Sequence, residues 1–180
     1  MKSVADIFGI ETVTADLYQY ALTHPSFTKE KSLPYNQCYE RLEFLGDAVL
    51  KLTISDVLFN IYPEAQEGEL SKIRSIIVSD NTLANIAKKN GLQELIIMSR
   101  HEEKQGCRNL NSICACAFEA ILGAYYLDGK FDEIINYIKT TFEPYITEVK
   151  NHFEKFNAKA ILQEYTQGQN KTTPIYTVLN

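Results

Sequence analysis

The sequence predicts an all-α protein followed by a short C-terminal segment of a different kind. Apolar residues recur at helical spacing through most of the chain, and no strand-like alternation of any length precedes residue 170. The composition, 45% apolar and 23% charged over 180 residues, is ordinary for a globular domain with a real core. We therefore expect one helical domain over residues 1–150 and an incomplete appendage over residues 151–180.

The first third of the chain divides into helices at its turn-forming residues. Two short helical patterns occupy the first thirty residues. Pro25 follows His24, which predicts that a helix ends there and an extended turn begins. Helical spacing then holds from Tyr39 to about Phe59, so a long helix is expected over this stretch.

The remainder of the main domain continues the helical pattern. The stretch "GELSKIRSIIVSDNTLANIAKKNG" predicts two helices, with Ser79 or Asp80 as an N-cap and Gly91 as a C-terminal stop. Residues 101–111 show little periodicity and are expected to form a polar loop. A helix over "SICACAFEAILGAYYLDG" follows, and then a helix that Pro144 should kink or break.

Bulk properties narrow the class of protein. The net charge of −5 is mild grounds against a nucleic-acid-binding protein, which usually carries a basic face, although it does not say where the charges lie. Four cysteines without a recognisable signal peptide predict reduced thiols in the cytoplasm. No apolar run approaches about 18 residues, so no membrane span is expected.

Three acidic residues in "ERLEFLGDAVL" lie on one face of the expected long helix. At about 100° per residue, Glu40, Glu43 and Asp47 fall within about 60° of one another. Such carboxylates repel one another by about a few tenths of a kcal/mol per neighbouring pair, and only Lys51 borders them. Two interpretations are open, a solvated acidic face or a cluster that a divalent cation neutralises.

Two further features favour the cation cluster. Phe44 lies beside the acids and away from the core face, as a stray surface aromatic or as an anchor that fills a pocket on another chain. In the later helix, Cys116, Glu119 and Gly123 share the face opposite the core. The small residues around Glu119 would let that helix approach the acidic one closely, bringing Glu119 to the cluster with Cys116 at its edge.

Four ordered stretches resemble ribonuclease III, a family of double-stranded RNA endonucleases. They are "ALTHPSF", "YERLEFLGDAVL", "EGELSKIRSIIVSDNTLANIA" and "AFEAILGAYYLDG", and together they span about residues 15–150. The later "AKAILQEYTQ" resembles the first helix of the α/β double-stranded RNA-binding domain that follows the catalytic domain in bacterial members. The resemblance therefore implies a helical endonuclease domain and the first part of an RNA-binding domain.

The resemblance implies a role for each matching residue. Asp47 and Glu119 match catalytic and metal-binding carboxylates, Glu43 a further metal ligand, and Phe44 the dimer anchor that enters a socket on the partner. Cys116 stands where the family has a metal-binding aspartate.

The resemblance also assigns roles to residues outside the set of metal-binding and dimer-anchoring positions. Glu40 and Glu67 match further acids of the cleft, and Gln163 and Glu164 match RNA-contacting positions, in a helix that follows a minor groove.

The implied function is a cytoplasmic, homodimeric endoribonuclease that uses Mg²⁺, or Mn²⁺ as a substitute, to cut both strands of RNA duplexes such as ribosomal RNA precursors and leaves 5′-phosphate ends. Cys116 weakens the expectation of Mg²⁺-dependent activity. Mg²⁺ prefers oxygen ligands, and a thiol among carboxylates resists deprotonation. A soft-metal role for Cys116 is a lesser alternative. The rival hypothesis is a catalytically weak or silent RNA-binding dimer of the same family.

Overall fold

The computed structural model describes residues 2–156 together with residues 162, 165, 166 and 168, and all statements below concern this part of the chain. The helices in chain order are α1 (Val4–Phe8), α2 (Ala15–Ala21), α3 (Pro25–Lys31), η1 (Tyr35–Gln37), α4 (Glu40–Ile61), α5 (Glu67–Ile77), α6 (Asp80–Asn90), η2 (Leu92–Leu95), α7 (Arg100–Lys104), η3 (Cys107–Asn109), α8 (Asn111–Leu127) and α9 (Phe131–Phe156).

The predicted all-α architecture is confirmed for the described residues. They form no strand, although an isolated parallel bridge joins Thr23 to Ile97. Around that bridge, Ile97 donates its N–H to the Leu22 carbonyl at 2.8 Å, and His24 donates to the Ile97 carbonyl at 2.8 Å. These bonds tie the segment after α2 to the segment before α7. No helix in the described part of the chain is long and apolar enough to cross a membrane.

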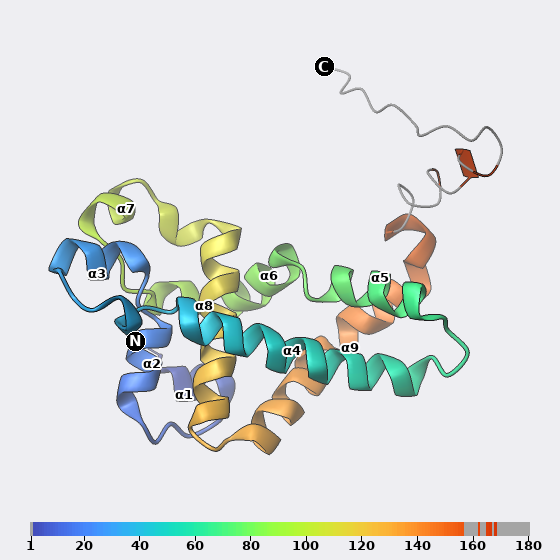
Figure 1. Cartoon of the computed structure of the whole chain (residues 1–180), viewed down its shortest axis with the longest axis horizontal. Coiled ribbons are helices and arrows are strands. Elements are labelled where there is room, and N and C mark those ends of the chain that lie inside the picture. Colours follow the sequence, from blue (N-terminus) through green and yellow to red (C-terminus); the bar gives the residue numbers. More distant parts are fainter. Residues whose placement is uncertain (1, 157–161, 163–164, 167, 169–180) are drawn as a thin grey trace.

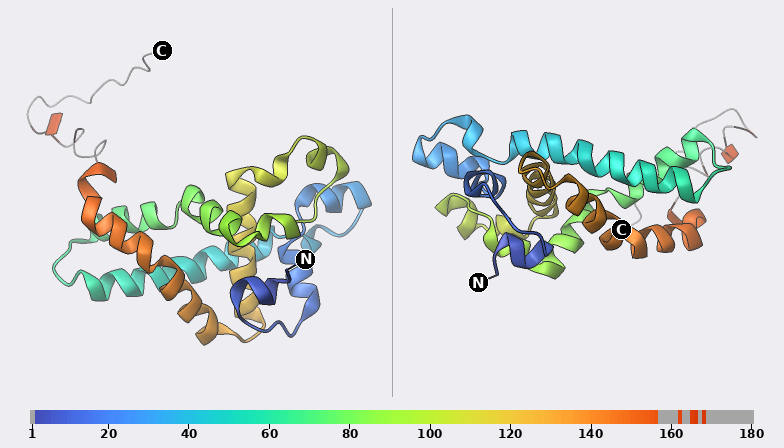
Figure 2. Two further views of the ribbon diagram at one scale, coloured as in Figure 1. Left: turned by 180° about the vertical axis from the view of Figure 1, so that it is seen from behind. Right: turned by 90° about the horizontal axis from the view of Figure 1, so that it is seen from below.

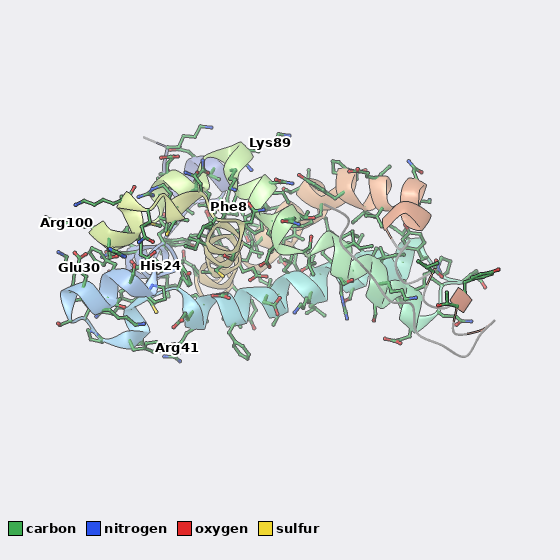
Figure 3. All side chains as sticks on the ribbon, turned by 90° about the horizontal axis from the view of Figure 1, so that it is seen from above. Phe8, His24, Glu30, Arg41, Lys89 and Arg100 are labelled. Atoms are coloured by element: carbon green, nitrogen blue, oxygen red, sulfur yellow. The ribbon has the colours of Figure 1, made fainter. Side chains whose placement is uncertain are left out.

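Helix α8 is the centre of the molecule. It runs across α4, while α1 and α2 lie at one end, α6 beside it, and α5 and α9 beyond it along the outer half of α4 (Figures 1 and 2). Phe118, Ile121 and Tyr125 of α8 are fully buried, as the predicted core face requires. Phe8 of α1 packs its ring against Phe118 at a centroid distance of 5.7 Å, and it lies next to α8 in Figure 3. The core therefore surrounds α8 on most sides.

An aspartate after α8 ties the N-terminal segment to this core. The carboxylate of Asp128 accepts hydrogen bonds from the Val13 N–H at 2.8 Å, the Thr14 N–H at 3.0 Å and the Tyr18 hydroxyl at 2.7 Å. Partial burial opposes ionisation, but these donors outweigh it and lower the pKa of Asp128 from 3.8 to about 2. The start of α2 is thereby held by a charged group more than a hundred residues away in the chain.

Two details of the predicted helices are wrong, at Pro25 and over residues 101–111, and the structure shows no break at Pro144. Pro25 is the first residue of α3, because proline suits the first helical turn, and the Nδ1 of His24 accepts a hydrogen bond from the Ser26 N–H. The expected loop over residues 101–111 contains α7 and η3, which Ser99 and the glycine at position 106 delimit. Helix α9 continues through Pro144 to Phe156. By contrast, Ser79 caps α6 and Gly91 ends it with a φ of 82°, as predicted.

Candidate active site

The acidic residues of α4 lie together at the surface in its first three turns. Glu40, Glu43 and Asp47 are each partly buried, while the core-facing Leu42 and Val49 are buried on the other side. The predicted amphipathic arrangement is therefore confirmed. The side chain of Phe44 stands beside the acids and is 81% exposed, which is unusual for an aromatic residue.

Two glycines bring α8 against this face of α4. A β-carbon on Gly46 would lie 1.7 Å from the backbone oxygen of Glu119, and one on Gly123 would lie 2.2 Å from the backbone oxygen of Leu42. Neither position has room for any side chain. The close approach carries Glu119 to the acids of α4, as the small residues of "AFEAILGAYY" predicted.

The acids line one open pocket of about 770 Å³. Its walls include Glu40, Glu43 and Asp47 from α4, Glu119 from α8, and Asp80 from the first turn of α6. The structure thus joins acidic residues from three helices, and we call these five residues the acid pocket. Lys51 is a cation within it, and its amine forms an ion pair with Asp47 at 2.8 Å.

The acid pocket is an unfavourable place for negative charge. Burial, and then the negative charge of Asp47 and its neighbours, raises the pKa of Glu119 from 4.5 to about 8. Burial also raises the pKa of Glu43, which a hydrogen bond with Cys116 partly offsets. At pH 7 the pocket therefore holds more protons than isolated carboxylates would, and a cation would replace them.

Cys116 lies at the edge of the pocket as a neutral thiol. Its side chain is partly buried on α8, one turn before Glu119. Burial, and then the charge of Glu43, raises the pKa of Cys116 from 9.0 to about 12. The thiol can donate a hydrogen bond to Glu43 at neutral pH, but it adds no negative charge to the pocket.

The donor set of the pocket suits a hard divalent cation. Carboxylate oxygens are the ligands that Mg²⁺ prefers, and several of them meet here with little compensating positive charge. In the described part of the chain, however, no three Asp, Glu, His or Cys side chains converge closely enough to hold a metal ion as they stand. The backbone therefore brings carboxylates from three helices to one pocket without arranging any three of them as a metal site among the described residues.

Comparison with known proteins identifies the family of this arrangement. Residues 14–146 match the family model described as Ribonuclease-III-like. A ribonuclease 3 of Fusobacterium nucleatum is 40% identical over 164 residues, which cover 91% of this chain and 70% of that protein. This chain belongs to the ribonuclease III-like family.

Solved structures agree with that assignment to the ribonuclease III-like family. The nuclease domain of ribonuclease III from Campylobacter jejuni superposes with a TM-score of 0.71 at 36% identity, covering 81% of this chain and 97% of that one. A second structure of that nuclease domain, reported for structural flexibility in the region involved in dimer formation, gives a TM-score of 0.68 at 38% identity, covering 77% and 96%.

Not every residue predicted from the resemblance to ribonuclease III lies at the acid pocket. Glu67 begins α5 and lines a separate pocket with Phe59 and Arg74, where its carboxylate accepts a hydrogen bond from the Ser71 hydroxyl at 2.8 Å. Its role as a cleft acid stays a prediction that one subunit does not support. Residues 163 and 164, predicted to contact RNA, lie outside the described residues.

Asp80 is the member of the acid pocket that sequence analysis missed. It was considered only as an N-cap of α6, a role that Ser79 fills. No periodicity in the sequence links Asp80 to α4 or to Glu119, because only the packing of α6 against α8 brings it there. An acidic residue in the turn between two predicted helices was the available signal, and it is a weak one.

An apolar pocket adjoins the acids on the other side of Phe44. It has a volume of about 720 Å³ and is bounded by Leu17, Tyr20, Leu45 and Leu127, with Phe44 at its rim. Arg41 of α4 also borders it and lies on the outer side of the helix in Figure 3. The exposed Phe44 and an apolar pocket therefore lie side by side on one surface.

Proposed function

We propose that the protein is a divalent-metal-dependent endoribonuclease that cleaves double-stranded RNA. The observation that carries the proposal is the acid pocket, in which α4 and α8 place Glu43, Asp47 and Glu119 together on a ribonuclease III-like fold. Processing of structured RNAs such as ribosomal RNA precursors, in the cytoplasm, is the corresponding cellular role. The products would carry 5′-phosphate ends, since water adds to phosphorus and the bond to the 3′ oxygen breaks.

In this proposal three acids of the pocket bind the cation. Glu43, Asp47 and Glu119 would hold the cation, with Asp47 and Glu119 as the catalytic carboxylates. A bound Mg²⁺ ion, for which Mn²⁺ can substitute, supplies positive charge beside that phosphate and makes water a better nucleophile. Glu119, whose pKa is about 8 without metal, would have to lose its proton to bind a cation. Without a cation, Lys51 pairs with Asp47.

We further propose a symmetric homodimer in which Phe44 of each subunit enters the apolar pocket of its partner. A twofold interface is self-complementary, so an anchor and its socket must lie on the same surface, as Phe44 and the pocket beside it do. An aromatic side chain that is 81% exposed costs free energy in water and gains it in a pocket. Each subunit of such a dimer would cut one strand of the duplex.

The C-terminal segment completes the proposed substrate binding. Residues 151–180 would form a linker and the beginning of a double-stranded RNA-binding domain, with residues 163 and 164 at the RNA. Duplex binding should fall steeply as salt rises, because contacts with the phosphates would dominate it. Binding that is the same at low and at high salt would contradict this expectation.

A second candidate function, a catalytically silent RNA-binding dimer, is favoured by Cys116. The family pattern at this position is an aspartate, and a neutral thiol supplies neither its charge nor a hard oxygen ligand. The remaining acids of the pocket favour the enzyme. Both candidates share the fold, the dimer and the RNA duplex, so only turnover separates them.

Cleavage of a long RNA duplex tests the proposal and its rival. The parent chain should cleave slowly in Mg²⁺ and faster in Mn²⁺, which tolerates softer and less regular ligand sets. Cys116→Asp should raise cleavage in Mg²⁺, and Glu119→Gln should abolish the activity. Cys114→Ala is the matched control, because Cys114 lies on the same helix but is fully buried and donates to the Arg108 carbonyl at 3.3 Å.

The outcomes of this assay separate the two functions. A parent chain and a Cys116→Asp variant that are both inactive in either metal would refute the endoribonuclease and leave the silent dimer. A parent chain that already matches Cys116→Asp in Mg²⁺ would show that position 116 is not a required ligand.

A further inference from the structure

Asp80 occupies a place in the acid pocket that its position in the chain does not explain. It is the first residue of α6, after the capping Ser79, whose hydroxyl accepts a hydrogen bond from the Thr82 N–H. The side chain of Asp80 is exposed and, within the described part of the protein, makes no hydrogen bond or ion pair. The carboxylate is therefore uncommitted.

The packing of α6 against α8 directs this carboxylate at the other acids. Asp80 lines the acid pocket with Glu43, Asp47 and Glu119, on the wall that neither α4 nor α8 supplies. Lys51, the lysine of the same pocket, is paired with Asp47 rather than with Asp80.

A simpler role for Asp80 would be electrostatic stabilisation of its own helix. An acidic residue in the first turn interacts favourably with the helix dipole, and Asp16, Asp132 and Glu69 have the same placement in α2, α9 and α5. None of those three lines the acid pocket. The dipole therefore accounts for an acid at the start of α6 but not for its location among four other carboxylates, where repulsion opposes it.

The absence of a carboxylate at position 116 explains why Asp80 lies in the acid pocket. α8 carries Cys116 one turn before Glu119, where the family pattern has an aspartate, so the pocket lacks one carboxylate of that pattern. Asp80 approaches the same space from the neighbouring helix. We propose that Asp80 is a cation-binding carboxylate of this chain, which supplies from α6 the negative charge that Cys116 does not supply from α8.

This assignment rests on the proposed divalent-metal function, but it makes a separate claim about affinity. Removing a carboxylate that supports a metal site typically weakens binding by about 10- to 100-fold. Asp80→Asn should therefore weaken Mn²⁺ and Mg²⁺ binding by roughly tenfold, at the lower end of that range because Asp80 is exposed. In a Cys116→Asp background the same substitution should matter less, because the family carboxylate is restored and the two positions are coupled.

The test measures metal binding without RNA. Isothermal titration with MnCl₂ and MgCl₂, and the metal-induced rise in melting temperature, are compared for the parent, Asp80→Asn, Cys116→Asp and the double variant. Asp132→Asn is the matched control, since it removes an exposed first-turn aspartate from α9, far from the pocket. Glu119→Gln reports whether the pocket binds the metal at all.

Each outcome bears on the assignment. A tenfold loss in Asp80→Asn, little change in Asp132→Asn and a smaller loss in the Cys116→Asp background would support it. Equal metal affinities of the parent and Asp80→Asn, with Glu119→Gln weakened, would overturn it and leave the proposed function intact. An Asp80→Asn loss of the same size in both backgrounds would overturn the compensation for Cys116. Absence of metal binding by the parent would overturn both proposals.

Discussion

Substitution of Gly46 by alanine should destabilise the protein and disturb the acid pocket together. The added β-carbon would lie 1.7 Å from the Glu119 backbone oxygen and 2.9 Å from the Gly123 nitrogen, where ordinary contacts begin at 3.4 Å. Both neighbours are helix backbone, which cannot rotate away as a side chain can. Helices α4 and α8 must therefore separate at the point where Glu119 meets the acids of α4.

The size of the effect follows from the required displacement. Relief of the closest contact needs a shift of about 1.7 Å, a large movement in a close-packed interior. Overpacking of a core typically costs about 1–3 kcal/mol, and we expect about 3 kcal/mol or more here because backbone must move. For a domain of this size, a loss of about 3 kcal/mol lowers the melting temperature by roughly 6–12 °C.

Thermal unfolding followed by circular dichroism measures this loss, with Gly68→Ala as the matched control. Gly68 lies in the first turn of α5, and a β-carbon there meets nothing within 4 Å. That variant should be unchanged or more stable by about 0.5–1 kcal/mol, because alanine loses less backbone entropy in a helix than glycine does. A Gly46→Ala protein as stable as Gly68→Ala, with metal affinity retained, would refute the close approach of α4 and α8.

Three further predictions concern the dimer and the titrating groups. Phe44→Ala should weaken the dimer by on the order of 2 kcal/mol, and an unchanged sedimentation profile would show that Phe44 is not the anchor. Asp128→Asn should cost about 2 kcal/mol in denaturant titrations at pH 7, from the loss of charged hydrogen bonds to Val13, Thr14 and Tyr18. Because its folded pKa is about 2, below the unfolded value of 3.8, that difference should shrink as pH falls from 4 to 2. Glu119 has the opposite sign: its folded pKa of about 8 lies above 4.5, so the metal-free protein should lose stability as pH rises from 4.5 to 8. Glu119→Gln should flatten that slope, and an identical slope in both proteins would contradict the burial of Glu119.

Features that depend on a single helix could be predicted from the sequence. The acidic face of α4, the exposed Phe44 and the core face of α8 follow from helical geometry, and the structure confirms each of them. The approach of α8 to α4 was also predicted, from the small residues around Glu119, whereas the tight contact at Gly46 is visible only in the structure. These inferences need only the period of the helix and the size of side chains.

Features that depend on how helices pack were harder to predict. Asp80 reaches the acid pocket because α6 packs on α8, and Glu67 lies at another pocket because α5 begins at the far end of α4. Local rules were insufficient at the prolines. Pro25 begins α3, because proline suits the first turn of a helix. Pro144 does not break α9, in which the buried residues Phe142 and Ile146 flank it.

Hydrogen bonds and an ion pair hold the segment from α7 to η3 in place, and hydrophobic periodicity does not reveal them. Arg108 donates through one guanidinium nitrogen to the carbonyls of Gln93 and Ile96, both at 2.7 Å, and pairs with Glu103. Glu30 of α3 accepts a hydrogen bond from the Arg100 N–H at 2.9 Å, and these two residues lie at the same end of the molecule in Figure 3. Polar contacts of this kind order a stretch whose composition predicts a loop.

The central position of α8 limits how this chain can change in length. One residue added between Glu119 and Gly123 would turn the following side chains by about 100° around the helix axis. The glycine would then leave α4 while Glu119 still faced it, and buried positions such as Tyr125 would point elsewhere. Insertions and deletions should therefore be tolerated in turns such as residues 63–66, between α4 and α5. They should be rejected inside α8, where the interval of four residues places Glu119 at the pocket and Gly123 against α4.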